Sequence, residues 1–288
     1  MSRSNYSFVF FGTPQLSVEV LEELVRVGLV PELIVASPDK PQGRKLVLTP
    51  PPTKRWAEAH SIPVIQPKSL KTDEGIGELL KKQYDFFVVA AYGKIIPQRV
   101  IDLPKKGVIN VHPSLLPKFR GASPIRSQIL SDDRDAGVSI MLIDADMDHG
   151  PTLSQIRVPV SPWPPSALTL EETLAKAGGA ELARVIPLWM NDEIKPAEQD
   201  HSLATFTQKI EKEHGLLDLA SDGYQNFLKI QAYRGWPGTY FMTEKNDKPL
   251  RVIVKDAVYE NGELRLTRVV PEGGKEMSYE DFLRGRGR

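Results

Sequence analysis

The sequence predicts an α/β fold: a doubly wound, mostly parallel sheet, followed by a smaller β-rich domain. Two observations lead to this fold class. Apolar runs typical of strands alternate with helical patterns through the first 190 residues, as a parallel sheet with crossover helices requires. Short β-rich runs separated by turn residues then fill the C-terminal part of the chain. We therefore predict a first domain over residues 1–190, a polar, proline-containing linker over 191–204 and a second domain over 205–288.

The elements of the first domain follow from apolar spacing and turn residues. Residues 7–12 form a β-rich run closed by Gly12, and residues 16–28 repeat apolar side chains at helical spacing before Gly28, a suitable C-cap. Further strands are expected at 31–37, 63–67, 84–93, 107–112 and 136–143. Further helices are expected at 53–60, 74–83, 123–131 and 168–190. In such sheets ligands bind beyond the carboxyl ends of the strands, so chemistry is expected at that edge.

The second domain begins with one helical pattern at 221–233. Strands are expected after it at 238–243, 250–259 and 263–270, each bounded by turn residues. A small β-rich module follows from this order.

Composition excludes several classes of protein. The 288 residues are 41% apolar, enough for two cores, and contain no cysteine, so disulfides, thiolate zinc sites and cysteine nucleophiles are excluded. Lysine plus arginine equals aspartate plus glutamate at 37 each, so any basic surface is local. The chain has no long apolar run and starts with a strand rather than a signal peptide, which predicts a cytoplasmic protein without membrane contact.

Common nucleotide, hydrolase and metal motifs are missing. The turn after the first strand has a single glycine, Gly12, where a dinucleotide fingerprint needs three, and neither a phosphate loop nor a GxSxG motif occurs. The stretch DADMDHG, residues 144–150, imitates the start of a calcium loop. His149 and Gln155 stand where that loop needs glycine and glutamate, so no metal is expected.

What remains is an amide, an imidazole and a carboxylate at predicted strand ends. Asn110 and His112 end the strand at 107–112, and Asp148 follows the strand at 136–143. Each polar group is costly to bury without a partner, and the three together favour a reaction site over three separate turn or cap residues.

The surrounding stretches resemble the formyltransferases that use 10-formyltetrahydrofolate. NVHPSLLPKFRGASPI (110–125) and DADMDHG match their Asn-x-His, Ser-Leu-Leu-Pro, Arg-Gly-x-x-Pro-Ile and Asp-x-Gly pattern. Five further stretches resemble the methionyl-tRNA formyltransferases of that superfamily: FGTP (11–14), SPDKPQGRKLVLTPPPTK (37–54), AYGKIIP (91–97), WPGTY (236–240) and PEGGKEMSYEDFLRG (271–285). The resemblance therefore covers both domains.

This resemblance implies a Rossmann-like formyltransferase domain and a C-terminal oligonucleotide-binding-like (OB-like) domain that binds tRNA, here trimmed to fewer strands. It implies formyl transfer from 10-formyltetrahydrofolate to the free amino group of initiator methionyl-tRNA, giving N-formylmethionyl-tRNA for translation initiation. Folate and initiator tRNA are the expected partners of a protein expected to be a monomer. The catalytic residues implied are Asn110, His112 and Asp148, and the folate contacts implied are Ser114, Leu115, Leu116 and Pro117.

The chemistry of these side chains agrees with the implied reaction. Attack of an amine on a formyl group places negative charge on oxygen, which the Asn110 amide and a protonated His112 can stabilise. Asp148 can orient that imidazole and take the proton released by the amine. Arg120 either holds its own turn or shapes the acceptor site.

A basic loop is the expected tRNA contact. From Lys40 to Arg55 the chain has no acidic residue, and Lys40, Arg44 and Lys45 resemble the tRNA-contacting insertion of the family. Phosphates supply most of the affinity for nucleic acids, which suits such a loop. In the C-terminal domain the tRNA contacts are expected from Arg251, Lys255, Arg284, Arg286 and Arg288.

Two alternatives stay open. A formyltransferase for an amino sugar on a nucleotide would share Asn110, His112 and Asp148, although the basic loop and the stretch at 271–285 favour tRNA. A non-catalytic folate-binding or tRNA-binding module would not need the three side chains together.

Overall fold

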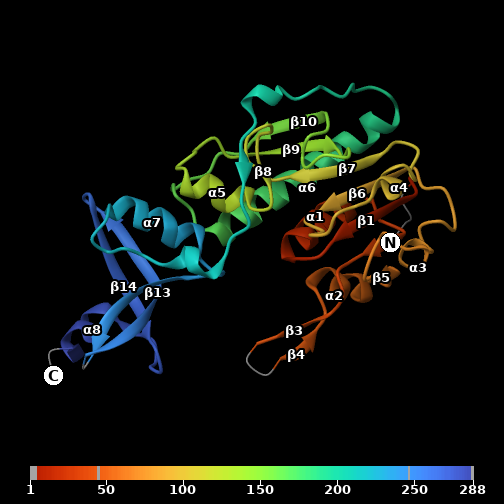
Figure 1. The fold of residues 1–288 in the computed structure, drawn as a ribbon. Helices are drawn as coiled ribbons and strands as arrows, with labels where there is room; N and C mark the ends of the chain where they lie inside the picture. The colour runs from red at the N-terminus through yellow and green to blue at the C-terminus, as the bar shows by residue number, and fades with distance from the viewer. Residues whose placement is uncertain (1–4, 44–45, 246, 287–288) are drawn as a thin grey trace. The chain divides into compact units, whose positions relative to one another are not determined.

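The computed structural model describes residues 5–43, 46–245 and 247–286, which fall into two compact units. The α/β unit comprises the chain up to residue 121 with residues 137–158 and 171–206. The C-terminal unit comprises residues 122–136, 159–170 and the chain from 207 onward. Each unit has its own sheet (Figure 1).

The α/β unit is built on a seven-stranded sheet of order β10-β9-β7-β6-β1-β2-β5. Its strands are β1 (Phe8–Gly12), β2 (Leu33–Val35), β5 (Val64–Ile65), β6 (Phe86–Ala90), β7 (Val108–His112), β9 (Gly137–Leu142) and β10 (Thr152–Arg157). Five strands from β7 to β5 run parallel, whereas β9 is antiparallel to β7 and β10 to β9. The mostly parallel sheet is confirmed, and β10 is a strand that the sequence pattern did not predict.

The helices up to residue 190 vary widely in length. They are α1 (Gln15–Arg26), α2 (Pro52–Ala59), α3 (Asp73–Ile76), α4 (Gln98–Ile101), α5 (Pro124–Leu130) and α6 (Ala167–Met190). The helix predicted at 74–83 is wrong, because α3 has one turn only. Gly75 and Gly77 weaken a helix there, and a Cβ at Gly75 would stand 1.8 Å from the Ser69 carbonyl oxygen. Across the described residues, no helix has the length and apolarity needed to cross a bilayer.

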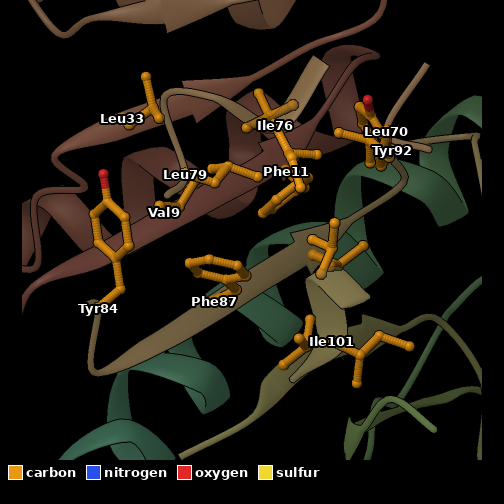
Figure 2. Packing of buried hydrophobic residues seen from close by; sticks show 14 residues of the cluster. Val9, Phe11, Leu33, Leu70, Ile76, Leu79, Tyr84, Phe87, Tyr92 and Ile101 are labelled. Carbon is orange, nitrogen blue, oxygen red and sulfur yellow. The ribbon is translucent and has the colours of Figure 1, made fainter. Parts of the chain in front are cut away.

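The parallel strands are buried on both faces, which explains their continuous apolar sequences. On one face, alternate residues of neighbouring strands form a cluster in which Val9, Phe11, Leu33 and Phe87 meet (Figure 2). Phe11 and Phe87 lie with ring centroids 5.4 Å apart. This core fixes the positions of the strands whose ends carry the candidate catalytic side chains.

Helix α6 approaches the opposite face through two glycines. A Cβ at Gly178 would stand 2.6 Å from Cγ1 of Val111 in β7, and one at Gly179 would stand 2.8 Å from Cβ of Glu23 in α1. The missing side chains therefore allow α6 to pack closely against both β7 and α1.

The basic loop forms a β-hairpin that projects from the α/β unit (Figure 1). Strands β3 (Lys40–Gln42) and β4 (Val47–Thr49) pair antiparallel, although a loop was expected here. At the base of the hairpin, the Asp39 carboxylate accepts hydrogen bonds from Gln66 Nε2 at 2.7 Å and Lys54 Nζ at 3.0 Å. These bonds lower the pKa of Asp39, the Gln66 bond most strongly and the lysine next.

The C-terminal unit contains a four-stranded antiparallel sheet with strands in chain order. Its elements are η2 (Lys212–Gly215), α7 (Gly223–Ala232), β12 (Thr239–Lys245), β13 (Lys248–Glu260), β14 (Glu263–Pro271), β15 (Met277–Ser278) and α8 (Tyr279–Arg286). Val252, Val254 and Val269 of the sheet pack with Phe282 of α8 in one core. A β-rich second unit is confirmed, with fewer strands than the five of a complete OB barrel.

Candidate active site

Asn110 and His112 lie at the carboxyl end of β7, the strand next to β6 in the sheet. Since side chains alternate along a strand, the two residues face the same side. The His112 side chain is 5% exposed, whereas Asn110 is partly exposed. The sheet core thus holds the imidazole firmly and leaves the amide accessible.

Asp148 reaches His112 from the loop at 143–151, between β9 and β10. Its Oδ1 lies 3.6 Å from Nδ1 of His112, a charge contact longer than a hydrogen bond. The sequence predicted that neighbouring strand ends would bring these groups together. Because β9 runs antiparallel to β7, its end at Leu142 lies opposite Ile109 instead, and the loop carries the carboxylate to His112.

The other ring nitrogen of His112 faces a carbonyl. Its Nε2 lies 3.1 Å from the carbonyl oxygen of Phe119. A carbonyl only accepts hydrogen bonds, so Nε2 carries a proton and donates. With Asp148 beside Nδ1 as well, both ring nitrogens face oxygens.

A backbone amide holds the Asp148 carboxylate from its other side. Gly121 N–H donates to Oδ2 at 2.7 Å, and Gly121 belongs to the short strand β8 (Arg120–Gly121). Asp148 itself has a φ of +51°, in the left-handed region. The carboxylate is therefore fixed at a backbone position that side-chain-bearing residues adopt at a cost.

The Asn110 amide is the free polar group of the site. Within residues 5–43, 46–245 and 247–286 its side chain has no hydrogen-bond partner. A partly exposed amide two residues before the imidazole can donate to a bound molecule without first breaking a bond within the protein.

The four residues expected at the folate differ in exposure. Ser114 is fully buried, and its Oγ donates to the Lys118 carbonyl at 2.6 Å, which closes the turn. Leu116 is 5% exposed, and its N–H donates to Ser139 Oγ at 3.0 Å. Leu115 and Pro117 remain partly exposed. The structure therefore places Ser114 and Leu116 inside the turn and leaves the other two at its surface.

The expected tRNA contacts are only partly visible. Lys40 is exposed at the start of β3, while Arg44 and Lys45 lie outside the described residues. Lys94, whose Nζ donates to the Pro67 carbonyl at 2.8 Å, has a lowered pKa because of burial first and the charge of Lys40 second. Lys40 and Lys94 are therefore close enough for their charges to interact.

The C-terminal unit offers a second set of basic groups. The Arg251 guanidinium lies over the Tyr240 ring, 3.6 Å from its centroid, and Lys255 on the same strand is exposed. Arg284 instead pairs with Glu280 and Asp281 on α8. Arg286 ends α8, and Arg288 lies outside the described residues.

The sequence pattern missed the residues that support Asp148. Arg120 binds two side chains, Gln199 and His201, rather than the carbonyls of its own turn. Gln199 falls within residues 191–204, which were expected to be a linker, but Ala197 in that segment bridges Thr152 of β10. A polar stretch without apolar period gives no signal that one of its glutamines is buried.

Known proteins resemble this chain in sequence and fold. A family model described as formyl transferase matches residues 6–186. The methionyl-tRNA formyltransferase of Halalkalibacterium halodurans is 37% identical over 97% of this chain and 94% of its own length. That of Bacillus subtilis is 36% identical over 96% of this chain and 94% of its own length.

Solved structures show the same fold at lower identity. A methionyl-tRNA formyltransferase from Clostridium thermocellum superposes with a TM-score of 0.63 at 15% identity, covering 95% of this chain and 99% of that one. A sugar N-formyltransferase from a Shewanella species gives the same TM-score at 16% identity, with 85% and 96% covered. Since the close relatives match along nearly the whole chain, the protein belongs to the methionyl-tRNA formyltransferase family.

Proposed function

We propose that this protein transfers the formyl group of 10-formyltetrahydrofolate to the amino group of initiator methionyl-tRNA, and that it works as a monomer in the cytoplasm. The observation that carries the proposal is the contact of His112 with Asp148 at 3.6 Å, beside an Asn110 amide with no partner in the described chain. Asn110, His112 and Asp148 are the proposed catalytic residues.

The methionyl amine attacks the carbonyl carbon of the formyl group. The bond from that carbon to the folate nitrogen then breaks, and tetrahydrofolate leaves with the proton that the amine has released. Asn110 donates a hydrogen bond to the formyl oxygen as negative charge develops there. Protonated His112 adds a second, charged donor. Its Nε2–H is held by the Phe119 carbonyl at 3.1 Å, so donation to the substrate requires that bond to be exchanged.

Asp148 has two tasks in the proposed reaction. Its Oδ1 faces Nδ1 of His112 and orients the ring. Its carboxylate, 17% exposed, also takes the proton that the amine releases, directly or through water. No covalent intermediate with the enzyme is needed.

The residues proposed to contact folate and tRNA are chosen by the exposure of their side chains. We assign the apolar folate contact mainly to Leu115 and Pro117, while Ser114 and Leu116 hold the turn from within. We assign the tRNA contact to Lys40 with Arg44 and Lys45, and to residues 205–288 as the tRNA-binding domain. Lys40 adds a positive charge at the base of a projecting hairpin, where phosphates of an acceptor stem could bind.

The test is formyl transfer from 10-formyltetrahydrofolate to charged initiator methionyl-tRNA, compared with uncharged tRNA and an amino-sugar nucleotide. Wild type is expected to formylate only the charged tRNA, and Arg44→Ala is expected to weaken that transfer. Transfer to the sugar would identify the other branch of the superfamily. Folate binding without transfer to any acceptor would indicate a non-catalytic module.

A further inference from the structure

Arg120 is a buried cation without an acidic partner. It is 3% exposed, and its Nε and Nη2 both donate to Gln199 Oε1, at 3.2 and 2.7 Å. Nη2 also lies 2.8 Å from His201 Nδ1. Where the structure describes the chain, no carboxylate pairs with this guanidinium. An arginine that costs free energy to bury is therefore used to hold a neutral glutamine.

The orientation of Gln199 follows from this contact. Its Oε1 accepts from Arg120, so its Nε2 must point the opposite way, where it donates to the carbonyls of Asp148 at 3.0 Å and Gly150 at 2.7 Å. Gln199 is 7% exposed, and both of its amide hydrogens are used on the loop that carries the carboxylate. A flipped amide would leave Arg120 facing N–H groups.

Asp148 is held both at its carboxylate and at its backbone carbonyl. Residues 120 and 121 are adjacent in β8: the backbone N–H of Gly121 binds the Asp148 carboxylate, and the side chain of Arg120 reaches the Asp148 carbonyl through Gln199. This double attachment holds a residue whose φ of +51° is unfavourable without support.

We infer that Gln199, oriented by Arg120, is a positioning residue for Asp148 and sets the distance and angle of its carboxylate relative to His112. The inference rests on the proposed function, because it matters only if Asp148 acts in the reaction. Gln199 touches neither reacting group, and its effect passes through the backbone of residues 148–150.

The test removes the N–H donors of the Gln199 side chain with substitutions of similar size. Gln199→Glu retains an oxygen for Arg120 and strengthens that contact with a charge, but it offers no N–H to the two carbonyls. Gln199→Met removes the donors without adding a charge. The matched control is Gln128→Met, since Gln128 is also buried and its Nε2 donates to the Asp135 carbonyl at 3.2 Å in the C-terminal unit.

Single-turnover formyl transfer and thermal unfolding are measured for each full-length variant. Both Gln199 variants are expected to lower kcat about 10- to 100-fold, because misplacement of a catalytic group by about 1 Å can cost up to about 100-fold. KM for each substrate should stay within about threefold of wild type. Both Gln199 variants leave two carbonyls without their donor and should lose some stability, whereas Gln128→Met should lose stability but keep its kcat.

A double-mutant cycle separates positioning from a merely structural role. If Gln199 acts through Asp148, adding Gln199→Glu to Asp148→Asn should cost little beyond Asp148→Asn alone. Equal losses in both backgrounds, or wild-type kcat in folded Gln199→Glu, would overturn the inference while Asp148→Asn still shows the proposed function intact. Wild-type activity of Asp148→Asn would overturn both.

Discussion

The edge of the α/β unit that carries the candidate site and the β3–β4 hairpin differ in how their polar groups are held. At the edge, His112 and Asp148 are largely buried and each is bound to backbone groups of residues 119–121. On the hairpin, Lys40 is exposed, and so are Leu46, Val47 and Leu48, at 59 to 71%. Reacting atoms need fixed geometry, whereas phosphate contacts tolerate movement. The edge should therefore control kcat and the hairpin should control binding of tRNA.

The largest effect is expected from Asp148→Asn. Loss of the base and of the charge facing His112 should lower kcat about 10³-fold or more, with little change in KM for either substrate. Single-turnover kinetics with saturating folate and tRNA measures the rate of transfer, and steady-state kinetics with each substrate varied in turn measures KM. Asp146→Asn, in the same loop and exposed, should behave as wild type. A large rise in KM instead would turn Asp148 into a binding residue and weaken the contrast between the two regions.

A smaller loss is expected from Asn110→Ala. Removing one donor to the developing oxyanion should lower kcat about 10²-fold and leave the fold intact, since the amide has no partner within the described residues. Kinetics and thermal unfolding on the same sample check both points. Asn191→Ala, at an exposed amide that donates to Glu193, serves as control. Unfolding of the Asn110 variant would argue that the amide serves the sheet rather than the reaction.

A substitution on the hairpin should change the binding of tRNA rather than kcat. Lys40→Ala should raise KM for methionyl-tRNA a few-fold, keep kcat, and reduce the slope of log affinity against log salt by about 0.7 to 0.9. Titration of tRNA binding at several salt concentrations measures it. Lys81→Ala removes an exposed lysine that pairs with Glu78 and should change neither quantity. A change in kcat with unchanged salt slope would contradict a phosphate contact.

The smallest effect concerns stability at acid pH and belongs to neither region. Burial would raise the pKa of Asp85, but hydrogen bonds from Ser7 N–H and from Lys105 outweigh it and lower the pKa. Its contribution to stability is therefore complete above the unfolded pKa of about 3.9 and is lost as pH falls through the folded value. Urea unfolding should show that the free energy of unfolding falls less at acid pH in Asp85→Asn than in wild type. If the variant loses as much stability at acid pH as wild type does, other carboxylates cause that loss.

Local pattern was enough for the sheet but not for the contacts around the site. The strands at 7–12, 84–93 and 107–112 were predicted because burial on both faces leaves continuous apolar runs. The antiparallel direction of β9 was not, because strand direction depends on pairing distant in sequence. The helix at 74–83 failed because two glycines and close packing outweighed the apolar spacing.

In the candidate site too, some residues could be predicted from local sequence pattern and others could not. Asn110, His112 and Asp148 were proposed from residue type, position at strand ends and resemblance, and the structure brings His112 and Asp148 within 3.6 Å of each other. Gln199 was not found, because its role depends on a buried arginine 79 residues away in sequence. Side chains that hold other side chains have no short-range pattern.

The paired glycines of α6 limit how the protein can be engineered for heat resistance. Exchanging a helical glycine for alanine commonly gains about 1 kcal/mol. At Gly178 the added methyl would overlap Val111, which stands between Asn110 and His112 in β7. A gain in helix propensity would therefore displace the strand that carries two of the proposed catalytic residues. Gly285 in α8 has open space around its Cβ position and is the safer site for such a change.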